Sequence, residues 1–332
     1  LPNSEEERNA LTVHKTFDAN ITVSNNKITL NTDNVSSESW ADSTKYGIRV
    51  YGTEIPDNNR DKGYEPTADT LPPTGIYYIS GVTVTNNAIT TVNNEKTSYL
   101  RCAIRLNHAK NCTVTKNTVN AAAASDASKS SSGINLLTTA NCTVSSNSVK
   151  NAYNGISVST GSTGDKVISN TVSSCIQSGI SVSSKSTVDS INSNTVSGTF
   201  THGICVSGTS KVGKINANKI TGGKKNGIMI TESSQVTGTI SSNTIKSTKG
   251  SGILVYTSAT ANSITSNKLS KTKKYAISVS DKSTCKSFSG NKITSCANKN
   301  KIYISPNSKG IVLNKTSIKI KKKKSATIKV SF

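Results

Sequence analysis

The stretch that decides the fold is GISVSSKSTVDSINSNTV at residues 179–196, which returns as GICVSGTSKVGKINANKI at residues 203–220. Both copies contain a Gly-Ile pair and an apolar residue two places after the Ile. Both also place an apolar residue three positions before an Asn and another two positions after it. A fixed period of about 24 residues is typical of repeat proteins, in which each unit buries its apolar face against its neighbours.

The same pattern recurs along most of the chain. The repeated Asn stands at Asn26, Asn87, Asn117, Asn147, Asn170, Asn194, Asn218, Asn243, Asn267 and Asn291. The repeated pair begins at Gly47, Ala103, Gly133, Gly155, Gly179, Gly203, Gly227, Gly252 and Ala276. Each apolar cluster is short, rich in Val and Ile, and bounded by Ser, Thr, Asn and Gly, which favours strands of about three to five residues joined by turns.

Three such strands per repeat predict a parallel β-helix, in which successive coils stack about 4.8 Å apart. Three positions of the repeat then form inward stacks: the apolar residue three places before the Asn, the apolar residue two places after it, and the Ile of the Gly-Ile pair. We expect the Asn to point inward at a tight corner and to bond the Asn above and below, as Asn ladders do in other stacked sheets.

The Asn-x-Val/Ile and Gly-Ile-x-Val pattern resembles the right-handed parallel β-helix group that includes pectate-lyase-like proteins and many bacterial surface proteins. The resemblance covers roughly residues 11 to 304 and implies an all-β solenoid, but the same coil serves lyases, hydrolases, epimerases and adhesins. We therefore expect a cap segment at 1–20, a β-helix at 21–304 and a separate end at 305–332.

Both ends leave alternatives open. Residues 4–7 read Ser-Glu-Glu-Glu, a capping-box spacing that predicts a short helix, either as an N-terminal cap or at the boundary of a longer chain. Neither an apolar signal-peptide core nor a membrane-spanning run occurs in that segment. Near the other end, LNKTSI at residues 313–318 is followed by KKKKSATIKV at residues 321–330. With these two runs, residues 310–332 resemble the opening strands of a bacterial immunoglobulin-like domain of the Big2 type, and a two-strand cap is the alternative.

Charge divides the chain. Residues 1–100 hold 13 acidic and 8 basic residues, and residues 101–332 hold 5 acidic and 32 basic residues. The two parts therefore carry net charges of −5 and +27, which sum to the total of +22. The first part also carries two long interruptions of the pattern, roughly 31–46 and 52–75, and long segments on a rigid scaffold are where function concentrates.

The middle residue of each Gly-Ile-x-Val strand points outward, which places Arg49 and Arg105 on one face in adjacent coils, followed by Asn135. Two guanidinium groups one coil apart form a clamp for a carboxylate or sulfate. The predicted substrate-binding residues on and around this face are Arg49, Arg105, Trp40, Tyr51, His108 and Asn135.

The same face supports other interpretations. The resemblance implies that an Arg there can act as a base, so candidate catalytic residues are Arg49, Arg105, Asp42 and Asp57, with calcium as the cofactor of a lyase. The outward strand positions from Asn135 to Ser278 contain no carboxylate, which weighs against catalysis. Alternatively the two arginines simply pair with acidic loop residues.

Lysines in the connecting segments of three consecutive repeats predict a basic ridge that attracts polyanions, or else a solvated edge that discourages aggregation. The ridge consists of Lys224, Lys225, Lys246, Lys249, Lys271, Lys273 and Lys274. Because aromatic residues are not interleaved with these lysines, we expect no nucleic-acid partner. Three His residues and no Cys-x-x-Cys predict no metal site, and Cys112 and Cys142, in equivalent positions of successive repeats, predict either a disulfide or a thiol stack.

These observations predict an exported bacterial surface protein whose β-helix binds a cell-wall glycan or an acidic polysaccharide, or serves adhesion. It would have no membrane insertion and would be a monomeric part of a larger multidomain chain. The alternatives are a polysaccharide lyase or glycoside hydrolase acting at the Arg49 and Arg105 face, and a structural stalk without a ligand.

Overall fold

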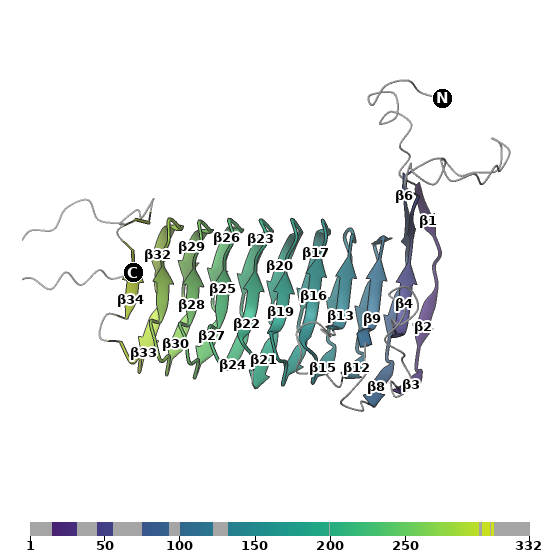
Figure 1. Cartoon of the computed structure of the whole chain (residues 1–332), viewed down its shortest axis with the longest axis horizontal. Helices are drawn as coiled ribbons and strands as arrows, with labels where there is room; N and C mark the ends of the chain where they lie inside the picture. Colours follow the sequence, from purple (N-terminus) through teal and green to yellow (C-terminus); the bar gives the residue numbers. More distant parts are fainter. Residues whose placement is uncertain are drawn as a thin grey trace, which may run out of the picture.

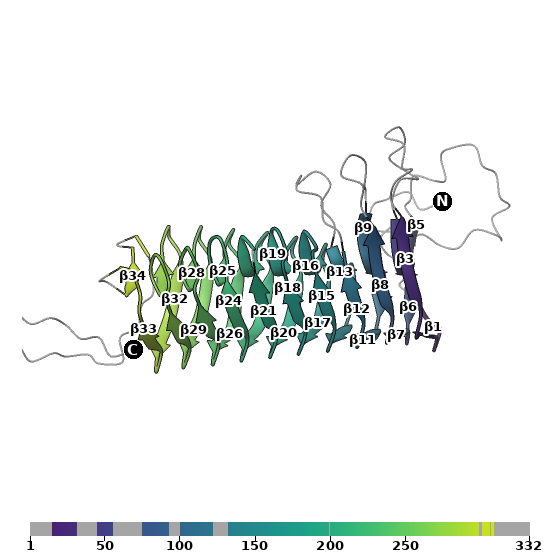
Figure 2. The same ribbon diagram turned by 90° about the horizontal axis from the view of Figure 1, so that it is seen from below.

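The computed structural model describes residues 15–31, 45–55, 75–92, 100–121, 132–198, 200–298, 301–305 and 307–308. Strands are the only regular secondary structure in these ranges. They form a parallel β-helix, as the repeat predicted, with the right-handed coil that the resemblance implied. Figures 1 and 2 show its coils stacked along one long axis from β1 at one end to β34 at the other. Trp40, Asp42 and Asp57, the predicted N-terminal helix and the Big2-like tail beyond residue 308 lie outside the described residues.

Three sheets, each of ten strands within the described ranges, make the walls of the solenoid. The first sheet consists of β2 (Thr22–Ser24), β7 (Thr83–Thr85), β11 (Thr113–Thr115), β14 (Thr143–Ser145), β17 (Thr163–Ile168), β20 (Thr187–Asn192), β23 (Lys211–Asn216), β26 (Gln235–Ser241), β29 (Thr260–Thr265) and β32 (Thr284–Ser289). The second consists of β3 (Lys27–Asn31), β8 (Ala88–Val92), β12 (Thr118–Asn120), β15 (Ser148–Lys150), β18 (Thr171–Ser173), β21 (Thr195–Gly198), β24 (Lys219–Gly222), β27 (Thr244–Lys246), β30 (Lys268–Ser270) and β33 (Lys292–Thr294). The third consists of β4 (Lys45–Tyr51), β9 (Leu100–Asn107), β13 (Ser132–Leu137), β16 (Asn154–Ser159), β19 (Ser178–Val182), β22 (His202–Val206), β25 (Ile228–Ile230), β28 (Ile253–Val255), β31 (Ile277–Val279) and β34 (Ile302–Ile304).

A smaller sheet lies at the N-terminal end. Strands β1 (Lys15–Asp18) and β10 (Ala109–Lys110) pair in parallel with β6 (Gly75–Ser80), and β5 (Thr53–Ile55) pairs with β6 in the antiparallel direction. This antiparallel pair departs from the uniform parallel stacking that the repeat predicts. It falls in the part of the sequence where the pattern carries its longest interruptions.

The core consists of the three inward stacks that the pattern predicted. Val167 pairs with Ile191 in the first sheet, Val172 with Val196 in the second and Ile156 with Ile180 in the third. All of these side chains are buried. Because neighbouring coils place the same small β-branched residues at the same height, a narrow core can be filled without large aromatic side chains.

The predicted Asn ladder is confirmed. From Asn26 to Asn291, each side-chain amide nitrogen donates to the side-chain oxygen of the next Asn along the axis, at 2.8 to 3.0 Å. The amide oxygen also accepts the backbone N–H of the preceding Asn, for example Asn194 N to Asn218 Oδ1 at 2.9 Å. The ladder therefore satisfies polar groups at a buried corner, where an unpaired group would be costly.

Close approach of the neighbouring chain favours Gly in the Gly-Ile pair in most coils. A Cβ on Gly179 would lie 2.3 Å from Val196 Cγ1 and 2.7 Å from the Gly203 carbonyl oxygen. At the start of most strands of the third sheet, the backbone therefore lies against a side chain of the second sheet, with no room for a Cβ at Gly179. Ala takes this place at Ala103 and at Ala276.

Candidate functional site

The outer face of the third sheet carries one continuous column of side chains. Arg49 pairs with Arg105, and Arg105 with Asn135, on adjacent strands, as the alternation predicted. The column continues through small or apolar residues and ends at Tyr303: Ser157, Ser181, Cys205, Met229, Leu254 and Ser278 stand between. Chemically distinctive side chains therefore gather at the two ends of the face.

The N-terminal end holds an Arg–Tyr cluster, which consists of Tyr46, Arg49, Tyr51 and Arg105. The Arg49 guanidinium lies 4.1 Å from the ring centre of Tyr51 and 5.1 Å from that of Tyr46. The Arg105 guanidinium lies 5.4 Å from the Tyr46 ring, and its Nη1 donates to the Tyr46 hydroxyl at 2.9 Å. Tyr46 thus touches both cations, and the rings hold the guanidinium groups in place without neutralising them.

Unused hydrogen-bonding capacity remains beside the cluster. Arg105 Nε and Asn107 Oδ1 are buried, and neither atom has a hydrogen-bond partner among the described residues. Asn107 is 7% exposed and follows Arg105 by two places on β9, so both side chains project from the same face. A donor and an acceptor left open in this way offer fixed contacts to a polar ligand.

Exposure separates the predicted residues of this end. Tyr51 is 46% exposed and Arg49 is exposed, whereas Asn135 is 9% exposed and His108 is 8% exposed. The His108 ring meets Tyr51 edge-on, with ring centres 6.4 Å apart, so His108 supports the Tyr51 ring rather than the open surface. Sequence reasoning missed Tyr46. Its position directly before the Gly-Ile pair, on the same strand as Arg49, could have indicated that it lies in the cluster.

Six of the seven lysines of the predicted ridge lie in the segments between the second and third sheets, and Lys246 is the last residue of β27. Backbone bonds stack these segments, because Lys249 N donates to the Gly223 carbonyl and Lys273 N to the Thr248 carbonyl. All seven predicted lysines are exposed. Lys224, Lys225, Lys249 and Lys274 also line a cavity of about 490 Å³.

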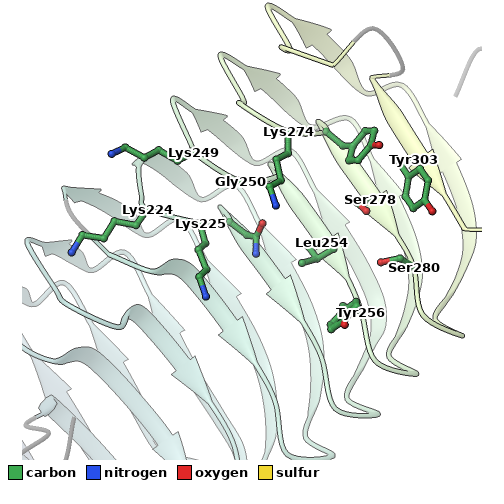
Figure 3. A pocket seen from close by; sticks show the side chains of 12 residues that line it. Lys224, Lys225, Lys249, Gly250, Leu254, Tyr256, Lys274, Ser278, Ser280 and Tyr303 are labelled. Carbon is green, nitrogen blue, oxygen red and sulfur yellow. The ribbon is translucent and has the colours of Figure 1, made fainter. Parts of the chain in front are cut away.

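This cavity, which we call the Lys–Tyr groove, occupies the C-terminal end of the same outer face. Its remaining lining residues are Asn226, Gly250, Leu254, Tyr256, Tyr275, Ser278, Ser280 and Tyr303. Figure 3 shows the Lys225 and Lys274 side chains extending over the strands, whereas those of Lys224 and Lys249 extend away from them. Three tyrosines thus lie beside the ridge lysines in the groove, a proximity that the spacing of the sequence did not predict.

The cysteine pair and the possible metal ligands were also considered in the sequence, and neither forms a ligand site in the described part of the chain. Cys112 and Cys142 stack as free thiols in adjacent coils, where the hydrogen bond between them lowers the pKa of Cys112 to about 7 and raises that of Cys142. Across the described ranges, no three His, Cys, Asp or Glu side chains are grouped to hold a metal ion. The described residues also include no helix long and apolar enough to cross a membrane.

Solved structures with a similar chain path share little sequence with this protein. A variant of the periplasmic alginate epimerase AlgG is 11% identical, with a TM-score of 0.49 over 91% of this chain and 76% of its own. The A-module of the Azotobacter vinelandii mannuronan C-5 epimerase AlgE4 is 11% identical, with a TM-score of 0.40 over 72% and 82%. DFA-IIIase from Arthrobacter chlorophenolicus A6 without its lid is 9% identical, with a TM-score of 0.42 over 89% and 82%.

No curated protein matches the sequence. The family described as "Periplasmic copper-binding protein (NosD)" matches residues 119–324, which is more than half of the chain. The match spans the regular coils from the Asn ladder at Asn147 to Asn291, where the repeat is least interrupted. The chain therefore belongs to the NosD family.

Proposed function

We propose that this protein is an extracytoplasmic carbohydrate-binding module that holds an acidic polysaccharide against the outer face of its third sheet. The observation that carries the proposal is the pair of guanidinium groups on adjacent strands, ordered by Tyr46 and Tyr51. Adjacent parallel strands lie about 4.8 Å apart, so the two cations can share one carboxylate or bind successive ones.

The chemistry of the cluster suits an acidic sugar. Planar guanidinium groups bind carboxylate and sulfate through paired N–H donors. Tyr51 presents an exposed ring on which the apolar face of a sugar can pack, and its hydroxyl stays available for a hydrogen bond. Arg105 Nε and Asn107 Oδ1 then serve sugar hydroxyls or the acid group.

The extracytoplasmic location rests on the family, whose description is periplasmic. Cell-surface display, adhesion and attachment to further domains are proposals of the same kind. Catalysis would require acidic residues beside Arg49 and Arg105, and the candidates Asp42 and Asp57 lie outside the described residues. We propose binding on the strength of the guanidinium pair, and the assay below also detects turnover.

The family description names copper, and the His202, Cys205 and Met229 side chains do not fit that ion. Copper(I) favours thiolate, thioether and imidazole ligands, and His202, Cys205 and Met229 lie on neighbouring strands of the third sheet. However, the Asn226 amide nitrogen lies 3.5 Å from His202 Nδ1 and 3.8 Å from Met229 Sδ, so it already occupies the space between them. Burial also raises the pKa of Cys205 to about 11, which keeps its thiol protonated.

The test compares the wild type with the double variant Arg49→Gln and Arg105→Gln on immobilised polyuronates, sulfated glycans and neutral glycans, with and without calcium. Loss of two charge-assisted contacts is expected to weaken binding of the acidic polymer about 100-fold. The control is Lys150→Gln with Lys166→Gln, which removes the same charge from exposed positions on the other two sheets.

Equal loss in the control and the double variant would show that net charge alone attracts the polymer. Release of shortened or unsaturated chains by the wild type, abolished in the double variant, would replace binding by catalysis. Unchanged thermal unfolding of each variant establishes that the fold is intact.

A further inference from the structure

We propose that the Lys–Tyr groove is a second, separate site, which takes a short anionic sugar segment through its carboxylate or sulfate group. It lies on β25 to β34, five strands beyond the Arg105 strand, or about 24 Å at the ordinary spacing of parallel strands. The inference does not depend on the Arg–Tyr cluster, because the two sites share no residue.

The size of the groove indicates a small occupant. Its volume of about 490 Å³ falls within the range of ordinary small-molecule sites, about 300–1,000 Å³. A few sugar rings fill such a space, whereas a long polymer would need a groove that continues along the face. The outer column becomes Cys205 and Met229 beyond the groove, which offer no charge to a polymer.

Charge in the groove has one sign. Lys225 and Lys274 reach over the strands from connecting segments two coils apart (Figure 3). None of the lining residues is acidic, and within the described part of the chain no carboxylate forms an ion pair with either ammonium group. Two ammonium groups facing a partly enclosed space favour an anion more strongly than lysines on an open surface do.

The tyrosines supply the other half of a sugar site. Tyr275 and Tyr303 stack with ring centres 5.0 Å apart and an interplanar angle of 26°, and Tyr303 is 37% exposed. Their stack presents an apolar platform at one end of the groove. Tyr256, which directly follows β28 and is 43% exposed, also lines the groove. Ser278 and Ser280 add hydroxyl groups between the rings, which suits the hydroxyl rim of a sugar.

The arrangement favours a sugar over a nucleic acid. Single-stranded nucleic acid is bound by a series of aromatic platforms along a basic path, with one base on each. Here two of the three rings stack on each other, so the groove presents that pair and Tyr256 rather than a series of separate platforms along a path. The experiment below includes an oligonucleotide to test this preference for a sugar.

The experiment uses protein that carries Arg49→Gln and Arg105→Gln, so that the first site cannot contribute. Binding is measured calorimetrically for a short galacturonate oligosaccharide, a short heparin oligosaccharide, a neutral malto-oligosaccharide and an oligothymidylate. The test pair is Lys225→Gln with Lys274→Gln, and the control pair is Lys246→Gln with Lys271→Gln, two exposed ridge lysines that do not line the groove. Tyr303→Leu tests the platform.

We expect one of the two anionic oligosaccharides to bind, and its identity separates a carboxylate from a sulfate ligand. The test pair should weaken it at least about tenfold, the loss of one charge-assisted contact, and the control pair less than about twofold. Tyr303→Leu should weaken it without changing its salt dependence. Equal losses in both pairs, tighter binding of the oligothymidylate, or no binding of either anionic sugar would each overturn the proposal and leave the Arg–Tyr cluster unaffected.

Discussion

Asn218 Oδ1 accepts both the backbone N–H of Asn194, at 2.9 Å, and its side-chain amide, at 3.0 Å. Asn218 Nδ2 in turn donates to the Ile191 carbonyl at 2.9 Å and to Asn243 Oδ1 at 3.0 Å. One buried amide therefore completes the backbone of the coil before it and continues the ladder into the coil after it. Asn is favoured at every coil because the ladder needs a donor and an acceptor at the same height.

Asn218→Ala should lower the free energy of unfolding by about 3 kcal/mol, because it orphans the Asn194 N–H and the Ile191 carbonyl in a buried corner. Chemical denaturation measures the change. Asn26→Ala is the control. Asn26 is exposed and ends the ladder, so its removal should cost less than about 1 kcal/mol. Equal costs at the two positions would contradict a cooperative ladder.

Ala217→Gly should stabilise the protein by up to about 1 kcal/mol. Ala217, directly before a ladder Asn, has φ of 55°, a left-handed conformation that costs about 1–2 kcal/mol for a residue with a Cβ. Gly290 already occupies the equivalent position of another coil with φ of 61°. The same substitution at Ala88, an exposed position within β8, should instead destabilise by about 0.5–1 kcal/mol. Denaturation midpoints of the two variants should therefore move in opposite directions.

Asp165→Asn should change how stability depends on pH. Burial raises the pKa of Asp165 to about 6, although the Thr139 hydroxyl and the Cys142 N–H both donate to its carboxylate. The unfolded pKa is about 3.9, so the stabilising contribution is fully present below about pH 4 and is lost as pH rises through 6. Denaturation at pH 4 and pH 7 should show the variant gaining up to about 3 kcal/mol relative to the wild type. A constant difference would contradict the raised pKa.

His202→Asn should shift the same profile in the opposite sense. Burial, and then the nearby Lys225 charge, lower the pKa of His202 to about 4, against about 6.5 when unfolded. The unfolded state therefore binds the proton first, and the wild type loses stability as pH falls from 6.5 to 4. The variant, which places at residue 202 the amide found at Asn226 in the next coil, should lose up to about 3 kcal/mol less over that range. Titration of the His202 ring by NMR above pH 5 would contradict this prediction.

The fold could be predicted because every coil repeats the same small set of physical requirements. The spacing from Val144 to Asn147 fixes one inward column and the ladder, and Gly179 marks the place where a Cβ does not fit. One irregularity escaped prediction, the antiparallel pairing of β5 with β6, because it lies where the repeat is interrupted and spacing no longer constrains the chain.

The site was predicted in part. The alternation placed Arg49 and Arg105 on adjacent strands, but it could not show that Tyr46 would contact both. The tyrosines of the groove were missed for a different reason. Tyr256 and Tyr303 stand outside the lysine-rich segments, whereas Tyr275 directly follows Lys274. The three tyrosines belong to separate coils, and only stacking brings them together beside Lys225.

The most direct test of the account is the number of acidic oligosaccharide segments that one protein molecule binds, measured by calorimetry with a short anionic oligosaccharide. The account predicts two sites in the wild type, one after Arg49→Gln with Arg105→Gln, one after Lys225→Gln with Lys274→Gln, and none when all four substitutions are combined. The account would be contradicted if the number of bound oligosaccharides were the same in every variant and the affinity decreased only with the number of charges removed.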